Sequence, residues 1–187
     1  MYCITLTSLY YYILITIYTN NVNSTGPDGP DGPTDITNPE QPTGGSGDNP
    51  ENGNDGNPDT CFESDGDQTP WWSLDLKKDW EIVSVHILAC SDNPSGLNNI
   101  KVVVTDESPY GDDDQPEDLS SDEFHDFGSH VGAVNENQWI KLKPDDTVPG
   151  RFVIIYVPGE GKLALADVKV YVRPVTDVAG PGEPEVI

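Results

Sequence analysis

The stretch PWWSLDLKKDWEIVSVHILA, residues 70–89, alternates apolar and polar side chains over most of its length. This period of two predicts β-strands over residues 71–76 and 80–89. In the first strand Trp72 shares a face with the two leucines that follow it, so Trp72 is expected in the core. Trp71 falls on the opposite face and is expected beside an edge of the sheet, where its indole N–H needs a partner.

Further short apolar runs follow, and clusters of Gly, Pro, Asn and Asp separate them. They cover residues 100–106, 138–143, 150–158 and 162–173. Residues 107–137 are acidic and are expected to form a disordered loop with at most one irregular edge strand. No helical period of ten or more residues is visible, so the sequence predicts an all-β protein, an antiparallel β-sandwich or jelly roll.

The charge of the chain restricts its partners. Its 187 residues include 33 acids and nine bases, a net charge of −24. Phosphate binding needs Lys and Arg to displace counterions, so nucleic acid is excluded as a partner. Neutral ligands such as sugars remain compatible with this charge. No nucleophile elbow, phosphate loop or metal-spacing motif is visible, so no enzyme activity is expected.

The ends of the chain differ in composition from its middle. Residues 1–19 resemble the apolar region of a signal peptide, or an uncleaved signal anchor, and therefore predict a secreted or membrane-anchored protein. Residues 20–59 hold eight acids and no bases among Gly, Pro and Asn, and they are expected to be a disordered linker carrying a possible N-glycan at Asn23. The sandwich is expected over residues 60–174, followed by a disordered tail at 175–187.

Two blocks of sequence resemble the fucolectins, or F-type lectins, a branch of the discoidin-like, galactose-binding-like jelly rolls. The first is TCFESDGDQTPWWSLDLKKDWEIVSVHILACSD, residues 60–92, and the second is PGRFVIIYVPGEGKLALADVKVYV, residues 149–172. Their order and spacing match those of the family, and they frame residues 60–173. The resemblance implies the galactose-binding-like fold and a carbohydrate-binding function.

The same resemblance locates the sugar-binding positions. The family's His falls at Glu63, the Arg of its Arg-x-Asp motif at Cys90, and the Asp of that motif is retained as Asp92. A third basic position falls at Gly96 or Leu97. A carboxylate or a thiol cannot replace a guanidinium as a hydrogen-bond donor to sugar hydroxyls. The resemblance therefore implies that the usual fucose recognition is lost or has moved to other loop residues.

The family's structural calcium site is better retained. Its Asp-Gly-Asn matches Asp55 and Asn57, a Ser position holds Thr60, and a Glu position in the last strand holds Asp167. Oxygen ligands of this kind suit Ca²⁺. The alternative, left open by the sequence, is a chance Asp-Gly-Asn in a linker rich in these residues.

Cys61 and Cys90 are the two cysteines outside the leader. The family's His and Arg converge on one sugar, so the resemblance implies that Cys61 and Cys90 lie close together. A disulfide and two separate thiols both remain open at this stage.

Two functions are therefore compatible with the sequence. In the first, the protein is a lectin-like module that binds glycans. In the second, it is a structural or adhesion module whose partner is a cell-surface protein. The sequence does not decide between a monomer and a homo-oligomer.

Overall fold

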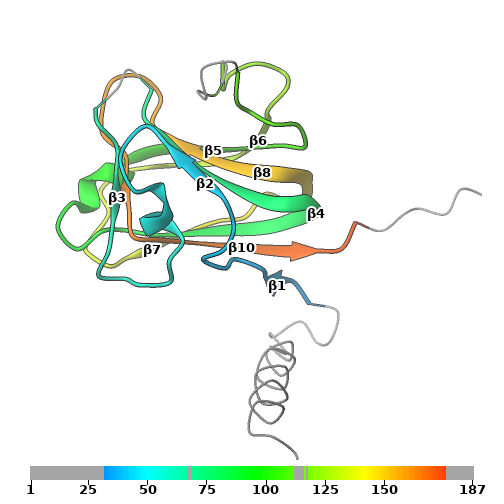
Figure 1. Ribbon diagram of the computed structural model, residues 1–187, viewed down its shortest axis with the longest axis horizontal. Coiled ribbons are helices and arrows are strands. Elements are labelled where there is room, and N and C mark those ends of the chain that lie inside the picture. Colours follow the sequence, from blue (N-terminus) through cyan, green and yellow to red (C-terminus); the bar gives the residue numbers. More distant parts are fainter. Residues whose placement is uncertain (1–31, 67–68, 112–115, 117, 176–187) are drawn as a thin grey trace, which may run out of the picture. The chain divides into compact units, whose positions relative to one another are not determined.

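The computed structural model describes residues 32–66, 69–111, 116 and 118–175 (Figure 1). Its strands are β1 (Thr34–Asp35), β2 (Thr43–Gly45), β3 (Phe62–Glu63), β4 (Trp71–Leu88), β5 (Asn99–Thr105), β6 (His125–Val131), β7 (Trp139–Leu142), β8 (Val148–Tyr156), β9 (Ala164–Leu165) and β10 (Asp167–Arg173). Two 3₁₀ helices, η1 (Pro50–Gly53) and η2 (Pro94–Leu97), lie in the connections. The described residues from Asp35 onward belong to one unit, which contains every site discussed below.

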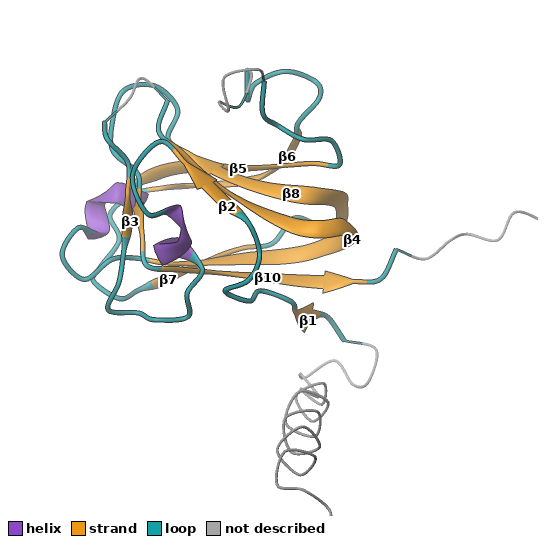
Figure 2. Ribbon diagram, in the orientation of Figure 1, coloured by secondary structure: helices purple, strands orange, loops and turns teal. Residues whose placement is uncertain are grey.

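Strand β4 links two antiparallel layers (Figure 2). Its first half lies between β2 and β8, and its second half lies between β10 and β7. The pairing with β8 moves from Asp75–Phe152 to Trp80–Gly150, so β4 has three more residues than β8 at this corner. Lys77 takes a left-handed backbone conformation there, with φ of 71°. The two strands expected at 71–76 and 80–89 are thus one bent strand, and the predicted β-sandwich is confirmed.

The core lies between the two layers and draws side chains from both. Trp72 is fully buried there, as predicted, and its Nε1 donates to the carbonyl oxygen of Pro50 at 2.8 Å. Gly53 lies against the indole, because a Cβ on Gly53 would come within 2.6 Å of Trp72 Nε1. The apolar alternation of β4, β5, β8 and β10 accounts for most of the remaining core.

A second apolar cluster lies on the outer side of the β4–β8–β5 layer. Trp71 is 4% exposed in this cluster, packed with Ile154 and Tyr156, and the ring centroids of Trp71 and Tyr110 are 5.8 Å apart. Leu119, from the long connection between β5 and β6, is buried in the same cluster. The expectation that residues 107–137 are disordered is therefore wrong for their described part, which covers this face. The irregular edge strand expected in this stretch is present as β6. Trp71 lies beneath that cover on a central strand, not at a sheet edge.

The linker expected at residues 20–59 is also different where the structure describes it. Over residues 32–59 the chain forms β2 along β4 and the helix η1. Few apolar side chains hold this segment. Instead, Asn54 Nδ2 donates to Asn38 O at 2.7 Å and Asn52 Nδ2 donates to Cys61 O at 3.0 Å. Composition predicted disorder because hydrogen bonds of this kind leave no hydrophobic pattern in the sequence.

The predicted leader at 1–19, the Asn23 glycosylation site and residues 20–31 of the linker lie outside the described residues, as does most of the tail. Within the described part of the chain, none of the helices has the length and apolar character needed to cross a bilayer.

Candidate functional site

The sugar-binding positions expected from the sequence gather at one end of the sandwich. Strand β3 pairs with β9, which places Glu63 opposite Ala164. The helix η2 lies against the same strand, because a Cβ on Gly96 would come within 2.5 Å of the Ala164 nitrogen. Glu63 and Asp92 are exposed there.

A disulfide joins Cys61 to Cys90, with their Cα atoms 6.0 Å apart. It connects the residue before β3, the strand that carries Glu63, to the loop that carries Asp92. Cys90 itself is fully buried and can make no contact with a ligand. Of the two alternatives that the sequence left open, the structure contains the bridge.

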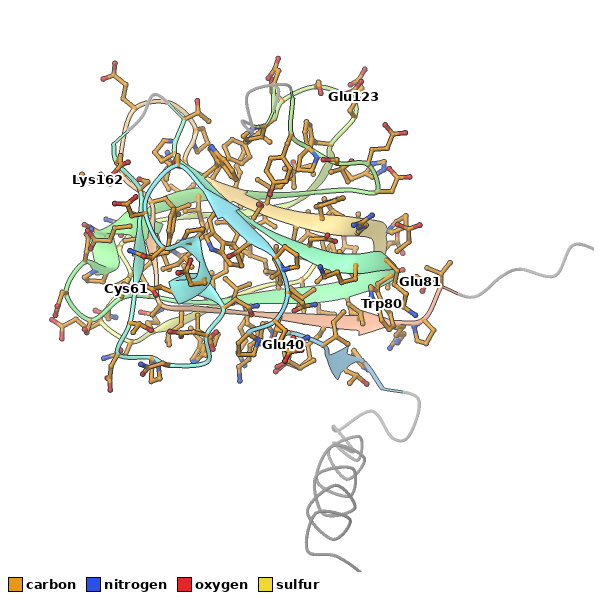
Figure 3. The ribbon with its side chains drawn as sticks, viewed as in Figure 1. Glu40, Cys61, Trp80, Glu81, Glu123 and Lys162 are labelled. Carbon is orange, nitrogen blue, oxygen red and sulfur yellow. A yellow bond between two sulfur atoms is a disulfide. The ribbon has the colours of Figure 1, made fainter. Side chains whose placement is uncertain are left out.

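Lys162 lies beside the segment that follows Glu63, and sequence reasoning did not identify it. Ser64 N donates to Leu163 O at 2.9 Å, and Leu163 N donates to Ser64 Oγ at 2.9 Å. These bonds hold the exposed Lys162 alongside Gly66, with 3.7 Å from Lys162 Cε to the place a Cβ would occupy on Gly66 (Figure 3). Only the cross-strand register reveals this lysine, because it lies far from Glu63 in sequence.

The exposed side chains at this end of the sandwich include both hydrogen-bond acceptors and a hydrogen-bond donor. The carboxylates of Glu63 and Asp92 can accept hydrogen bonds from hydroxyl groups, and the ammonium group of Lys162 can donate them. Cys90, expected from the sequence at the position of the family's Arg, is buried and presents no donor here.

The expected calcium ligands include three residues that already interact. The Thr60 hydroxyl lies 2.7 Å from Asp55 Oδ2 and 2.9 Å from the carbonyl oxygen of Asn57. Asn57 N donates to Asp55 Oδ1 at 2.8 Å. The turn from Asp55 to Thr60 thus gathers carboxylate, hydroxyl and carbonyl oxygens, which are the donor types that Ca²⁺ prefers.

Asp167 is the fourth expected ligand and a buried acid, 8% exposed. Burial raises the pKa of its carboxyl group, and the nearby carboxylates of Asp35 and Asp55 raise that pKa further. The backbone N–H of Val168 and the charge of Lys169 oppose the rise only in part. A cation beside these carboxylates would lower this pKa again. The described residues contain no group of three or more His, Cys, Asp and Glu side chains suited to a metal, and any such site would use hydroxyl and carbonyl oxygens as well.

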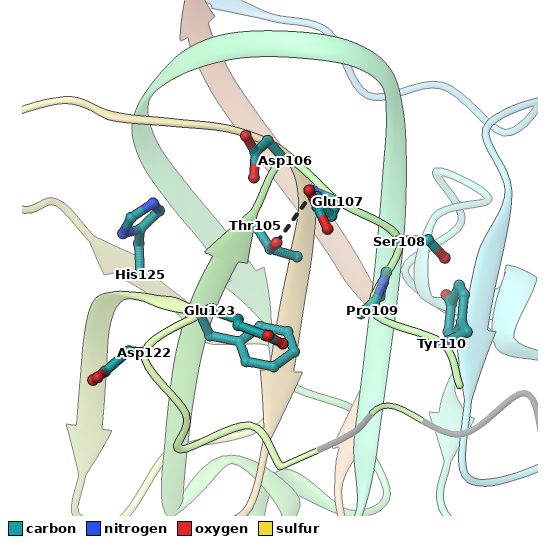
Figure 4. A pocket seen from close by; sticks show the side chains of 10 residues that line it. Thr105, Asp106, Glu107, Ser108, Pro109, Tyr110, Asp122, Glu123 and His125 are labelled. Atoms are coloured by element: carbon teal, nitrogen blue, oxygen red, sulfur yellow. Dashed lines mark hydrogen bonds between the residues drawn. The ribbon is translucent and has the colours of Figure 1, made fainter. Parts of the chain in front are cut away.

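A hollow of about 520 Å³ lies elsewhere, between the end of β5 and the residues that precede β6 (Figure 4). Its lining is acidic and aromatic. It consists of Thr105, Asp106, Glu107, Ser108, Pro109, Tyr110, Asp122, Glu123, Phe124 and His125. Glu123 lies far from Cys61 in Figure 3, so this hollow is separate from the sugar positions of the family. Sequence reasoning missed it because residues 107–137 were expected to be disordered.

A shallower groove of about 360 Å³ lies on the other side of Tyr110. Thr43 and Gly44 of β2 line it together with Trp71 and Phe152. The Tyr110 hydroxyl is 2.5 Å from Ser73 Oγ, which fixes the tyrosine between the two hollows.

A family model described as "NedA-like, galactose-binding domain" matches residues 52–155, more than half of the chain. The chain belongs to this family. The match begins within η1, includes the disulfide and the strands from β3 to β7, and ends one residue before the end of β8. It confirms the relationship to galactose-binding-like domains expected from the sequence.

Solved structures with the fold of this galactose-binding domain include several lectin and carbohydrate-binding modules. A fucolectin from striped bass (Morone saxatilis) serum is 19% identical, with a TM-score of 0.60 over 76% of this chain and 49% of that chain. A fucose-binding module from Streptococcus pneumoniae is 23% identical, with a TM-score of 0.56 over 75% of this chain and 96% of that one. The family 32 module of C. perfringens NanJ, solved with galactose, is 14% identical, with a TM-score of 0.54 over 74% of this chain and 98% of that one.

These likenesses establish the fold. The galactose-binding domain spans about half the length of the striped bass fucolectin. No curated protein sequence gives a significant match.

Proposed function

We propose that the protein is a secreted or cell-surface carbohydrate-binding module without catalytic activity. Its family and the fold it shares with a fucolectin and a galactose-bound module support this proposal. The disulfide agrees with an oxidising, extracellular environment.

The observation that carries the proposal is the joining of two loops at one end of the sandwich. The Cys61–Cys90 bridge ties the segment before β3, the strand that carries Glu63, to the loop of Asp92, and the pairing of β3 with β9 places Lys162 beside Gly66, which follows Glu63. Sugar hydroxyls both donate and accept hydrogen bonds, so exposed carboxylates and an ammonium group are suitable partners for them.

We further propose that this site does not recognise fucose in the way that fucolectins do. A buried disulfide occupies the position of the usual Arg, and Glu63 occupies the position of the usual His. The lining is mainly acceptor, which favours a sugar that presents several hydroxyl donors.

A glycan array on the purified chain, with and without Ca²⁺, tests the site. We expect binding to at least one neutral, non-fucosylated glycan, and we expect Asp92→Ala to weaken it at least tenfold. Asp145→Ala removes an equally exposed carboxylate elsewhere and serves as the matched control. The sugar proposal fails if the folded protein binds no glycan, or if Asp92→Ala leaves binding unchanged.

The second candidate is an adhesion module whose partner is a cell-surface protein. It is favoured by one observation, the complete burial of Cys90 where fucolectins present a donor. Capture of a protein from cell surfaces by the wild-type chain, together with a blank glycan array, would support this alternative.

We also propose that Asp55, Asn57, Thr60 and Asp167 hold a structural Ca²⁺. The interactions of the Asp55–Thr60 turn and the raised pKa of Asp167 support the assignment. Bound Ca²⁺ would connect this turn to the start of β10, and it would carry no chemistry beyond structural support.

A further inference from the structure

The outer side of the layer formed by β10, the second half of β4 and β7 carries a basic and aromatic surface. Pairing aligns Lys169 with His86, and His86 with Lys141, in one row across three strands. Trp139 and Tyr171 lie in the neighbouring rows. We call these five residues, Trp139, Lys141, His86, Lys169 and Tyr171, the basic face.

The direction of these side chains follows from the alternation of the strands. Ile87, Ile140 and Val168 point into the core and are buried. Their neighbours along each strand must point to the opposite side, where Lys141 is exposed and the other members of the basic face are partly exposed. Adjacent strands are about 4.8 Å apart, so the row spans roughly 10 Å.

Aromatic contacts hold the basic face in shape. The ring centroids of His86 and Tyr171 are 4.5 Å apart, and Lys169 Nζ lies 5.4 Å from the centre of the Trp139 ring. Ser84 Oγ is 3.3 Å from His86 Nε2. Two partly exposed aromatic rings thus flank the cationic row, a combination that can stack on the apolar face of a sugar ring.

Within the described part of the chain, the charges on the basic face are not paired in salt bridges, although Asp167, two residues before Lys169 on β10, and Asp35 act on them electrostatically. Among the described residues, the salt bridge present joins Arg151 to Asp75, so neither Lys141 nor Lys169 has a carboxylate in contact. The chain has 33 acids and only nine bases, so there are enough carboxylates for most of its bases to form salt bridges. Burial, Lys141 and Lys169 each lower the pKa of His86, whereas Asp35, at the border of the surface, raises it. Like charges therefore crowd this row, and an anion would relieve the repulsion.

We propose that the basic face is a second binding site, for a short saccharide bearing sulfate or carboxylate groups. The basic face can attract an anionic ligand only over its own area, because the rest of the chain is strongly acidic. A long polyanion such as nucleic acid, or an anionic membrane, would extend beyond the roughly 10 Å row and meet repulsion. A short anionic saccharide would contact only the lysines, His86 and the two aromatic rings.

Calorimetric titration with a heparin tetrasaccharide at low salt tests this site, with neutral chitotetraose as the control ligand. We expect the wild-type chain to bind only the anionic ligand, and the affinity to fall as salt is raised. Lys141→Ser with Lys169→Ser should weaken binding at least tenfold. Lys77→Asn with Lys101→Ser makes the same charge change at exposed lysines elsewhere and should leave binding unchanged.

Two further measurements distinguish the basic face from the loop end that carries Asp92. The pKa of His86, followed by NMR, should rise when the tetrasaccharide is bound, and Asp92→Ala should leave this binding intact. The proposal is overturned if the wild-type chain does not bind the tetrasaccharide, or if the double lysine variant binds it equally well. Equally tight binding of a short DNA duplex through the same lysines would also overturn it, since the surface would then recognise charge alone.

Discussion

At the scale of single residues, Trp71 and Trp72 are neighbours in sequence but belong to different apolar clusters. Successive side chains of a strand point to opposite faces, and both faces of this part of β4 are covered. Trp72 lies between the two layers, whereas Trp71 lies beneath the connection from β5 to β6. The pair therefore serves packing on two sides of the sheet.

Replacing Trp72 by Ala should lower the free energy of unfolding by about 3–5 kcal/mol, because a large fully buried side chain is lost. Urea denaturation followed by circular dichroism measures this change. Val131→Ala, at a residue that is 78% exposed, is the control and should change stability by less than about 0.5 kcal/mol. A Trp72→Ala variant as stable as the wild type would contradict the position of Trp72 in the core.

At the scale of elements, the corner of β4 is stabilised by an ion pair. Arg151 Nε and its second guanidinium nitrogen donate to the two Asp75 carboxylate oxygens at 2.7 and 2.8 Å. Lys77 N also donates to Asp75 Oδ1 at 2.7 Å. These contacts fix the residues that immediately precede the three-residue irregularity.

The hydrogen bonds from Arg151 lower the pKa of Asp75 below its usual value. The stability from this pair is therefore present above the unfolded pKa of about 3.9, and it is lost as the pH falls through the lower folded value. Arg151→Lys, which cannot form the two-pronged contact, should lower the urea midpoint at pH 7. The difference from wild type should shrink steadily below pH 4, and a difference of the same size at pH 2 would contradict the assignment.

The elements that could be predicted from the sequence are those long enough to show alternation. The strands around Trp72, Val102, Val153 and Val170 were expected on this basis. The corner of β4 was not, because the polar Lys77–Asp79 run resembles a turn. Strands β1, β2, β3 and β9 have only two or three residues, too few to produce a periodic signal.

The candidate sites were harder to predict, because they are formed by contacts between segments that lie far apart in the sequence. The resemblance to fucolectins located Glu63, Cys90 and Asp92, but Lys162 is brought beside the segment after Glu63 only by the pairing of β3 with β9. The basic face likewise requires the register among three strands. Period-two alternation gives the side of the sheet on which each residue lies, but it does not give the cross-strand neighbour.

At the scale of the whole molecule, the proposed calcium ion would connect the segment before β3 to the last strand. Millimolar Ca²⁺ should raise the melting temperature of the wild type by several degrees, since a ligand that binds only the folded state stabilises it. Asp167→Asn should abolish this shift. Calorimetry in EDTA and in Ca²⁺ measures both, and an unchanged wild-type melting temperature would dismiss the site.

The same variant has a second expected effect that does not depend on the metal. The folded pKa of Asp167 is raised by burial, so its favourable contribution is present at low pH and is lost as the pH rises through that pKa. In EDTA at pH 7, Asp167→Asn should therefore be more stable than the wild type. The advantage should disappear near pH 3, where the wild-type carboxyl group is protonated.

The Cys61–Cys90 bridge also determines how the domain would respond to mechanical tension. It spans a sequence separation of 29 residues and encloses the whole of β4, the strand shared by both layers. A pulling force applied through the chain ends would pass directly from Cys61 to Cys90 and would not extend the segment between them. Roughly 100 Å of contour length would therefore not be released under load. The strand β4 would stay inside the loop that the disulfide closes.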